Sequence, residues 1–392
     1  MSKIKVNSLE GVGASTPAIS IDNASGTCTA NITNNLSNRN LIINGAMQVA
    51  QRGTSSSSTN GIGCVDRFHN IRAGHDEEPT QAQHALTSSD TGPYEEGFRF
   101  SYHVTNGNQS SGAGAGDYMS MRYKIENQDI ANSGWNYTSA SSFITFSFWV
   151  KSSVAQNFYG YLKSTDGTDQ RYAYETGSLT ANTWTKITKT ISGNSNLQFD
   201  NNALQGLEIY LSQFWGTNYT DSGVSLNTWG AWSGGSRTPD NTATWYEADN
   251  ATFELTGVQL EVGSVATDFE HRSFAVEKRL CMRYYQQYTN IVATGYASDS
   301  SNTSYHHGFT FPVEMRAAPT YSITNTGSSN GQYVTDGNNN VYISSLSGGD
   351  FQAHNMAVHY NLTGDLTNFS SAYLFGVDAT AYQTTHKLSA EL

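Results

Sequence analysis

Residues 143–150 (FITFSFWV) alternate in a way that constrains the fold more than any other stretch of the chain. Phe146 and Phe148 fall on one face of an extended segment, while Thr145 and Trp149 fall on the other. Consecutive side chains of a β-strand point to opposite faces, so this order predicts a strand with one apolar face. We therefore expect this strand to belong to a sheet that packs its apolar face against a second sheet.

Similar short apolar runs recur between residues 40 and 270, separated by Gly, Asn, Asp and Ser; they are 159–162, 184–191, 207–211 and 253–260. Only 14% of the residues are charged, whereas 12% are aromatic and 36 are Gly. Such a composition is poor in helix formers and rich in residues that favour strands and turns. The sequence predicts an all-β protein with a jelly-roll β-sandwich over residues 40–270.

A single helix is expected within residues 271–289. Ser273 is a suitable N-cap, and six apolar residues follow at spacings near 3.6, which predicts a helix with one buried face. These residues are Phe274, Val276, Leu280, Cys281, Tyr284 and Tyr285. The strand pattern resumes afterwards, so we expect a short linking helix followed by a smaller C-terminal β-sandwich over residues 290–392.

Residues 1–39 contain too few apolar residues to form a core of their own. An extended segment of this kind can become ordered by adding a strand to the open sheet edge of another protein. We interpret residues 1–39 as an extended N-terminal anchor; the alternative is an unattached terminus.

Charge and cysteine content exclude several classes of protein. The formal net charge of -12 and the lack of clustered Lys and Arg argue against nucleic-acid binding. Cys28, Cys64 and Cys281 are far apart and cannot all pair, so no disulfide framework is expected. The sequence has no signal-peptide-like apolar region near its start and no apolar run of membrane-spanning length, so we expect cytoplasmic synthesis and no membrane insertion.

Three passages together resemble a family of phage and prophage tail-fibre and virion structural proteins. They are residues 39–53 (RNLIINGAMQVAQRG) followed by 66–68 (DRF), residues 257–272 (GVQLEVGSVATDFEHR) running into 281–285 (CMRYY), and residues 311–320 (FPVEMRAAPT). The leader, residues 1–9 (MSKIKVNSL), is similar to fibre N-termini in phages of marine cyanobacteria.

This resemblance implies a bacteriophage tail fibre or receptor-binding protein, located in the virion tail and made in the cytoplasm of the host bacterium. It also implies a jelly roll similar to carbohydrate-binding modules and a homotrimer, and it does not imply catalysis. The departures are Phe274 and Val276, where the family has small residues, and an acidic loop between Gly74 and Glu96.

Candidate glycan-binding residues lie in an aromatic, Gly-rich segment that holds four of the seven Trp residues. Aromatic faces pack against sugar rings, and nearby carboxylates or amides bond the hydroxyl groups. The predicted set is Trp215, Tyr219, Trp229, Trp232, Asp240 and Trp245. Trp229 and Trp232 are expected to be partly exposed, whereas Trp149 and Trp184 are expected in the core; the alternative for every Trp is packing.

No cofactor is expected, and calcium is the one metal for which the sequence offers candidate ligands. They are Asp76, Glu77, Asp166 and Asp169, whose spacing does not match an EF-hand loop, so solvated turn carboxylates are the alternative. His306 and His307 are neighbours on a predicted strand and should point to opposite faces, which argues against simple chelation by that pair.

The leading hypothesis is therefore a non-enzymatic tail fibre that docks on another phage tail protein through residues 1–39 and binds a host surface polysaccharide or lipopolysaccharide. No GxSxG, HExxH or P-loop string is present. One alternative is a purely structural tail adaptor or decoration protein. The other is a polysaccharide depolymerase, for which Glu95 and Glu96 are the candidate acids.

Overall fold

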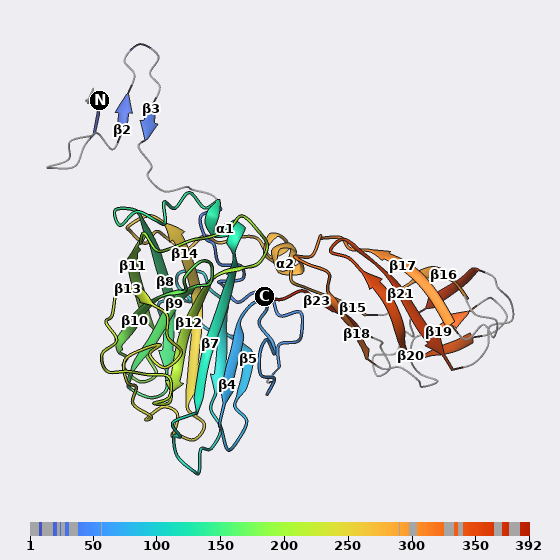
Figure 1. Ribbon diagram of the computed structural model, residues 1–392, viewed down its shortest axis with the longest axis horizontal. Helices are drawn as coiled ribbons and strands as arrows, with labels where there is room; N and C mark the ends of the chain where they lie inside the picture. The colour runs from blue at the N-terminus through green and yellow to red at the C-terminus, as the bar shows by residue number, and fades with distance from the viewer. Residues whose placement is uncertain are drawn as a thin grey trace.

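The computed structural model describes residues 8–9, 19–21, 24, 28–30, 38–55, 57–289, 291–297, 304–324, 333–335, 340–363, 371–375 and 385–392. Figure 1 shows a large β-sandwich joined through a short helix to a smaller β unit. Almost all of the regular structure is antiparallel strand, so the predicted all-β class is confirmed.

The sandwich consists of two antiparallel sheets. The six-stranded sheet has the order β13-β10-β9-β12-β7-β4, and the five-stranded sheet has the order β11-β8-β14-β6-β5. The strands of the first are β4 (His69–Ala73), β7 (Tyr118–Glu126), β9 (Asn157–Ser164), β10 (Gln170–Ser178), β12 (Gln205–Trp215) and β13 (Trp229–Ala231). Those of the second are β5 (Thr80–Ala85), β6 (Phe100–Thr105), β8 (Phe143–Ser152), β11 (Thr185–Ser192) and β14 (Thr252–Val262).

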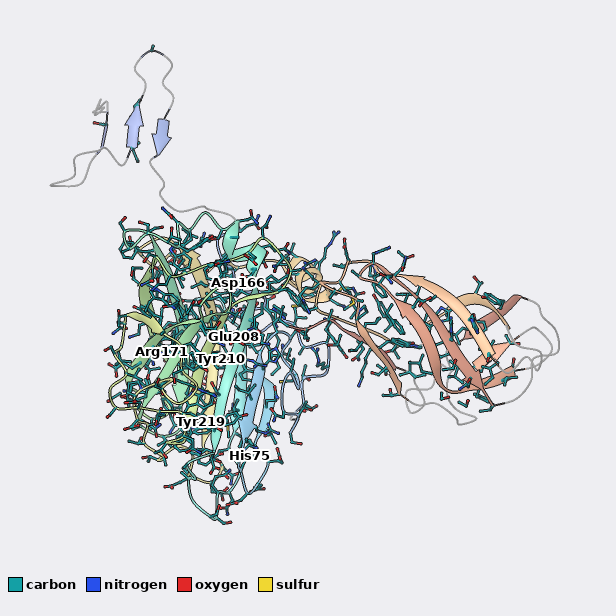
Figure 2. The ribbon with its side chains drawn as sticks, in the orientation of Figure 1. His75, Asp166, Arg171, Glu208, Tyr210 and Tyr219 are labelled. Carbon is teal, nitrogen blue, oxygen red and sulfur yellow. The ribbon has the colours of Figure 1, made fainter. Side chains whose placement is uncertain are left out.

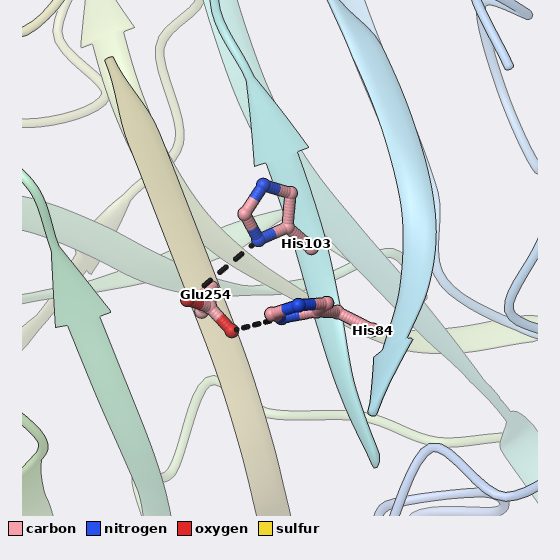
Figure 3. Close-up of side chains that lie close together, drawn as sticks. All are labelled: His84, His103 and Glu254. Carbon is pink, nitrogen blue, oxygen red and sulfur yellow. Dashed lines mark hydrogen bonds and ion pairs between the residues drawn. The ribbon is translucent and has the colours of Figure 1, made fainter. Parts of the chain in front are cut away.

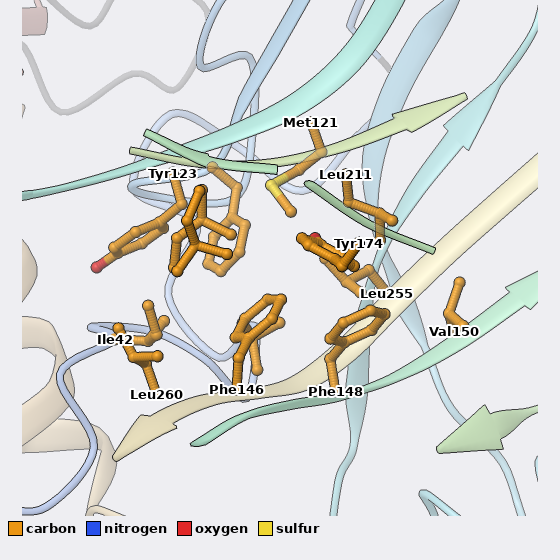
Figure 4. Packing of buried hydrophobic residues seen from close by; sticks show 14 of the residues in the cluster. Ile42, Met121, Tyr123, Phe146, Phe148, Val150, Tyr174, Leu211, Leu255 and Leu260 are labelled. Atoms are coloured by element: carbon orange, nitrogen blue, oxygen red, sulfur yellow. The ribbon is translucent and has the colours of Figure 1, made fainter. Parts of the chain in front are cut away.

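The core lies between these two sheets, as Figure 4 shows. Phe146 and Phe148 of β8 point inward and meet Tyr174 of β10, with ring centroids 5.8 and 6.4 Å away. Each fully buried side chain of this size contributes about 1.5–3 kcal/mol of hydrophobic stabilisation. The alternation of residues 143–150 therefore decides which face of β8 becomes core.

The linking helix is shorter than predicted; of the expected apolar face, Cys281, Tyr284 and Tyr285 are buried. α2 spans Phe274–Met282, after which Tyr285 begins strand β15. The expectation that Phe274 and Val276 are buried is wrong: they are 55% and 49% exposed. The helix buries Cys281, as expected, and also Glu277, whose carboxylate accepts a hydrogen bond from the backbone N–H of Asn44. α1 (Asn127–Ala131) is the other helix of the described residues.

The C-terminal unit is the smaller β unit expected, and six of its strands close into a barrel rather than forming two open sheets. The barrel order is β16-β17-β21-β20-β19-β22. These strands are β16 (Ala293–Ala297), β17 (Ser304–Thr310), β19 (Tyr333–Thr335), β20 (Asn340–Phe351), β21 (Asn355–Leu362) and β22 (Ser371–Phe375). A three-stranded sheet adjoins it, formed by β15 (Tyr285–Thr289), β23 (Thr385–Ser389) and β18 (Thr320–Thr324) in that order.

The described part of residues 1–39 includes three short strands that pair with one another. They are β1 (Ser8–Leu9), β2 (Ile19–Ile21) and β3 (Cys28–Ala30), in the order β1-β2-β3. The rest of the predicted anchor, apart from Ala24, Asn38 and Arg39, lies outside the described residues. No helix of the described chain is both long and apolar enough to span a bilayer.

A buried ion pair connects the sandwich to the C-terminal unit. Arg67 Nη1 donates to Glu391 Oε2 at 2.6 Å, and its guanidinium lies 3.4 Å from the ring centroid of Tyr284. Burial is the largest single influence and lowers the pKa of Arg67, but Glu391, Tyr123 and Tyr284 together outweigh burial, so the pKa is raised. Arg67 therefore remains charged inside the contact.

Two further groups reinforce this contact. Glu126, at the end of β7, accepts hydrogen bonds from Arg283 Nε at 2.7 Å and from the Tyr284 hydroxyl at 2.6 Å. Arg316 donates to the carbonyl of Ala203 in the sandwich at 2.9 Å. Side chains from both units thus satisfy each other's polar groups where they meet.

We expect Glu391→Gln to lower the free energy of unfolding by about 3 kcal/mol, because it leaves the charge of Arg67 buried and unpaired. The matched control is Glu314→Gln, which alters an exposed carboxylate and should change stability by less than about 0.5 kcal/mol. Urea denaturation followed by tryptophan fluorescence measures both. Equal midpoints for the two variants would contradict the role assigned to Glu391.

Buried histidines and tyrosines form a polar network between the barrel and its adjoining sheet. The Tyr321 hydroxyl lies 2.6 Å from both the Tyr360 hydroxyl and His386 Nδ1. Burial, followed by the nearby His307, lowers the pKa of His386 from 6.5 to about 3. His386 is therefore neutral in the folded protein at pH 7. His307 is buried and His306 only half-buried, as their predicted opposite directions require.

The network makes stability depend on pH. As the pH falls, His386 is protonated at a higher pH in the unfolded chain than in the folded chain. The contribution of neutral His386 to the free energy of unfolding is therefore complete above pH 6.5. It is lost as the pH falls from 6.5 towards 3, by about 1.4 kcal/mol per pH unit. Over this range we expect the free energy of unfolding of the parent to fall more steeply with decreasing pH than that of His386→Gln. The exposed His354→Gln should keep the parent's pH profile, and an unchanged profile for His386→Gln would refute the assignment.

Candidate functional site

Six aromatic residues gather on the outer face of the six-stranded sheet, and we call them the outer aromatic cluster: Tyr118, Tyr161, Tyr210, Trp215, Tyr219 and Trp232. The alternation of β9 and β12 places Tyr161 and Tyr210 opposite each other on this face. A β-bulge between Ser212 and Phe214 then advances the phase of β12 by one residue. Phe214 consequently joins the core, while Trp215 joins the outer face.

The rings of the outer aromatic cluster are in direct contact. Tyr161 and Tyr210 stack with centroids 4.2 Å apart, and Tyr118 stacks on Trp215 at 5.0 Å. Tyr219 and Trp232 come from the segment 216–244, which crosses this face between β12 and β14. Both are half-buried, so part of each ring remains open to solvent.

Arg237 holds the covering segment on the sheet. Its guanidinium carbon lies 4.4 Å from the ring centroid of Trp215, 4.5 Å from that of Tyr219 and 5.7 Å from that of Trp232. Lys163 of β9 also contacts Trp232: its Nζ lies 4.7 Å from the centroid of the indole ring. Cation–π contacts of this kind contribute about 0.5–2 kcal/mol each, so the half-buried rings are fixed in place.

Charged residues lie beside the rings on the same face. In the register of the sheet, Glu208 of β12 lies opposite Lys163 of β9, and Lys163 lies opposite Arg171 of β10. Figure 2 shows Arg171, Glu208, Tyr210 and Tyr219 distributed over this face of the sandwich. Burial, followed by the charge of Glu208, raises the pKa of Tyr210, so its hydroxyl stays protonated and donates to Glu208 Oε2 at 3.0 Å.

A small cleft opens next to the cluster. It has a volume of about 230 Å³ and is lined by Trp215, Asp240, Asn241 and Glu247, among others. Asp240 is exposed, and its carboxylate accepts a hydrogen bond from Thr220 Oγ1 at 2.7 Å. Trp215 is 1% exposed and offers no open ring face there, so the amide of Asn241 and the carboxylates of Asp240 and Glu247 are the groups that suit a ligand rich in hydroxyl groups.

The structure brings together four of the six residues predicted for the glycan site, Trp215, Tyr219, Trp232 and Asp240, but Trp215 is 1% exposed and lies beneath Arg237 and the neighbouring rings. The structure separates the other two. The expectation that Trp229 is partly exposed is wrong, because it is 9% exposed, packs on Tyr172 and donates to the Ser192 carbonyl at 2.7 Å. Trp245 is also buried in the sandwich core and donates to the Thr252 carbonyl at 3.0 Å. Trp232 is half-buried, as expected.

Trp149 and Trp184 occupy the outer face of the five-stranded sheet, so their predicted place in the core is wrong. Both are half-buried. Trp149 Nε1 donates to Glu96 at 3.0 Å, and Trp184 Nε1 donates to Asp90 at 3.0 Å. The alternation of residues 143–150 already placed Trp149 opposite Phe146 and Phe148, and that signal outweighs the general tendency of Trp to be buried.

The four predicted calcium ligands form hydrogen bonds or ion pairs with other residues. Asp76 accepts hydrogen bonds from the backbone and hydroxyl of Ser111, and Glu77 accepts one from the backbone of Asn108. Backbone hydrogen bonding by Ser111, followed by that of its hydroxyl, lowers the pKa of Asp76. Asp166 accepts from the backbone of Asp200 at 2.7 Å, and Asp169 pairs with Lys163 at 2.8 Å. Within the described residues, none of these four belongs to a cluster of metal-ligand geometry.

Comparison with known proteins gives distant structural likenesses. No protein-family model and no curated protein matches the sequence. The enzymatically active domain of tailspike protein 4 from bacteriophage CBA120 aligns with a TM-score of 0.30 and 11% identity, over 57% of this chain and 21% of the tailspike chain. A putative sugar-binding protein of Bacteroides thetaiotaomicron aligns at 0.29 and 10%, over 57% of this chain and 100% of its own.

The N-terminal cellulose-binding domain of Cellulomonas fimi β-1,4-glucanase C aligns with a TM-score of 0.26 and 9% identity, over 56% of this chain and 99% of that domain. The fold assignment rests on the strand order and pairing of this chain itself.

Proposed function

We propose that the protein is a non-enzymatic phage tail fibre that binds a host surface glycan through the outer aromatic cluster. The observation that carries the glycan site is the pair of half-buried rings, Tyr219 and Trp232, which Arg237 contacts; Thr220, the residue after Tyr219, lines a cleft together with Asp240 and Asn241. A sugar ring offers an apolar face for such aromatic groups and hydroxyl groups for the neighbouring carboxylate and amide.

The size of the cleft suits a short glycan segment. At about 230 Å³ it lies below the usual range of drug-sized pockets, which begins at about 300 Å³. A single site of this size is expected to bind weakly. In the proposed homotrimer three such sites act together, and the raised effective concentration strengthens attachment to a repetitive polysaccharide or lipopolysaccharide.

The remaining parts of the proposal rest on the sequence resemblance. Residues 1–39 attach the fibre to another phage tail protein, and the protein is located in the virion tail after synthesis in the host cytoplasm. The short strands β1 and β3 are the outer members of their sheet and have free edges within it, which suits pairing with a partner strand.

The proposal predicts that Trp232→Ala abolishes glycan binding, or weakens it by at least about tenfold, while the protein remains folded. Removing the half-buried indole deletes the apolar surface for the sugar but leaves the core of the sandwich intact. A glycan array with the full-length protein, followed by titration calorimetry against each glycan that binds, measures the loss.

The matched control is Trp184→Ala, which removes a half-buried indole from the opposite face of the sandwich. It should bind glycans like the parent. Equal losses in both variants would contradict a site at Trp232. If the parent binds no glycan, the outer aromatic cluster is packing, and the structural adaptor or decoration protein becomes the better description.

Measuring reducing-sugar release in the same samples tests the depolymerase alternative. Of its candidate acids, Glu96 pairs with Lys186 at 2.9 Å and accepts from Trp149, while Glu95 accepts a hydrogen bond from the backbone of Gly92. Release of sugar by the parent and its loss in Glu95→Gln or Glu96→Gln would overturn the non-enzymatic assignment.

A further inference from the structure

Two histidines and a glutamate converge on the outer face of the five-stranded sheet, the face opposite the outer aromatic cluster. His84 lies on β5, His103 on β6 and Glu254 on β14. His103 and Glu254 are direct partners in the register of β6 and β14. His84 pairs with Ser101, which lies two residues before His103 on the same face of β6. Figure 3 shows both imidazole rings directed toward the Glu254 carboxylate.

The distances within this group suit a transition-metal ion. His84 Nδ1 lies 3.2 Å from Glu254 Oε2, and His103 Nδ1 lies 3.6 Å from Glu254 Oε1. One ligand atom from each of the three residues falls within 4.8 Å of the other two. Zinc bonds nitrogen and oxygen at about 2.0–2.2 Å, which sets neighbouring ligand atoms of a tetrahedral site roughly 3.4 Å apart. Only small side-chain movements are needed to reach that geometry.

The contact between His103 and Glu254 is incomplete as it stands. His103 Nδ1 is buried and has no hydrogen-bond partner, because the 3.6 Å separation from the carboxylate oxygen is too long for a hydrogen bond. The other ring nitrogen, Nε2, lies 3.1 Å from Thr105 Oγ1. A metal-binding histidine typically has this arrangement, with one nitrogen held by a neighbour and the other free to bind the ion.

The surroundings of Glu254 also support a ligand role. Its side chain is 4% exposed, and Ser101 Oγ donates to Oε2 at 2.7 Å, which fixes the carboxylate. Lys151 Nζ lies 2.8 Å from Oε1, where it competes with a cation. Lys151 is also 3.0 Å from Asp90, so it keeps a carboxylate partner if a metal takes its place on Glu254.

We propose that His84, His103 and Glu254 form a zinc site that fastens the edge strand β5 to β14 across β6. Two imidazoles and one carboxylate are a ligand set that zinc accepts, and they leave a fourth position for water or an external ligand. His84 is exposed, so the ion can enter from solvent. β5 is the last strand of its sheet, and among the described residues the backbone of its outer side bonds only to Thr54 and Ser57, so the ion stabilises a weakly held edge.

Zinc binding to the metal-free full-length protein tests the proposal by titration calorimetry, with cobalt absorption as a second readout of tetrahedral nitrogen and oxygen ligands. We expect one ion per chain at this site and a higher Tm with zinc than without it. Loss of a supporting neighbour usually weakens metal binding by about 10–100-fold, so His84→Ala, which removes a ligand, should weaken it by at least as much.

The control is His354→Ala, which removes an exposed histidine of the C-terminal unit and should leave zinc binding at its parental strength. Lys151→Met should strengthen zinc binding several-fold, since it removes the cation that competes for Glu254. A parent that binds no zinc, or a His84→Ala variant that binds like the parent, would overturn the site. His84 is exposed at a sheet edge, so this variant should fold even if Glu254→Gln does not.

Discussion

The ion pair between Arg67 and Glu391 determines how the two units of the protein are held together. It joins a loop of the sandwich to the second-to-last residue of the chain, and the guanidinium lies against Tyr284, next to the linking helix. A charge buried in this way requires a partner, and here the partner comes from the other unit. The orientation of the barrel is therefore coupled to the formation of the sandwich, through Glu391 and the neighbouring pair of Glu126 and Arg283.

The two outer faces of the sandwich carry different chemistry because each strand alternates. The inward residues are almost all apolar, so the outward positions are free to hold stacked rings on one sheet and imidazoles with a carboxylate on the other. Both groups need the core beneath them to hold their strands in register. This arrangement separates a proposed recognition face from a proposed metal face by the thickness of the sandwich.

Much of the architecture could be predicted from local pattern. The alternation of residues 143–150 correctly assigned Phe146 and Phe148 to the core face of β8. Local pattern failed where a tertiary contact decides the outcome. Glu277 is buried and accepts a hydrogen bond from the backbone of Asn44, far away in sequence, whereas Phe274 and Val276 face solvent.

The functional residues show the same limit. The bulge in β12 that places Trp215 on the outer face leaves no recognisable mark in the sequence. Trp229 and Trp232 look alike as a motif, yet only the fold determines that one is core and the other half-buried. His84 and Glu254 are separated by 170 positions and are brought together by strand pairing, so sequence spacing gives no signal for them.

The pairing of β15 with β23 has a consequence for how such a protein can change over time. These strands enclose the barrel between them in sequence, and both run at its base, next to the sandwich. The segment between them therefore behaves as a cassette whose two ends are fixed at one place. A recombination event that exchanged residues 290–384 would replace the barrel together with β18 and Arg316, so the new segment must supply its own strand beside β23 and its own contact with Ala203.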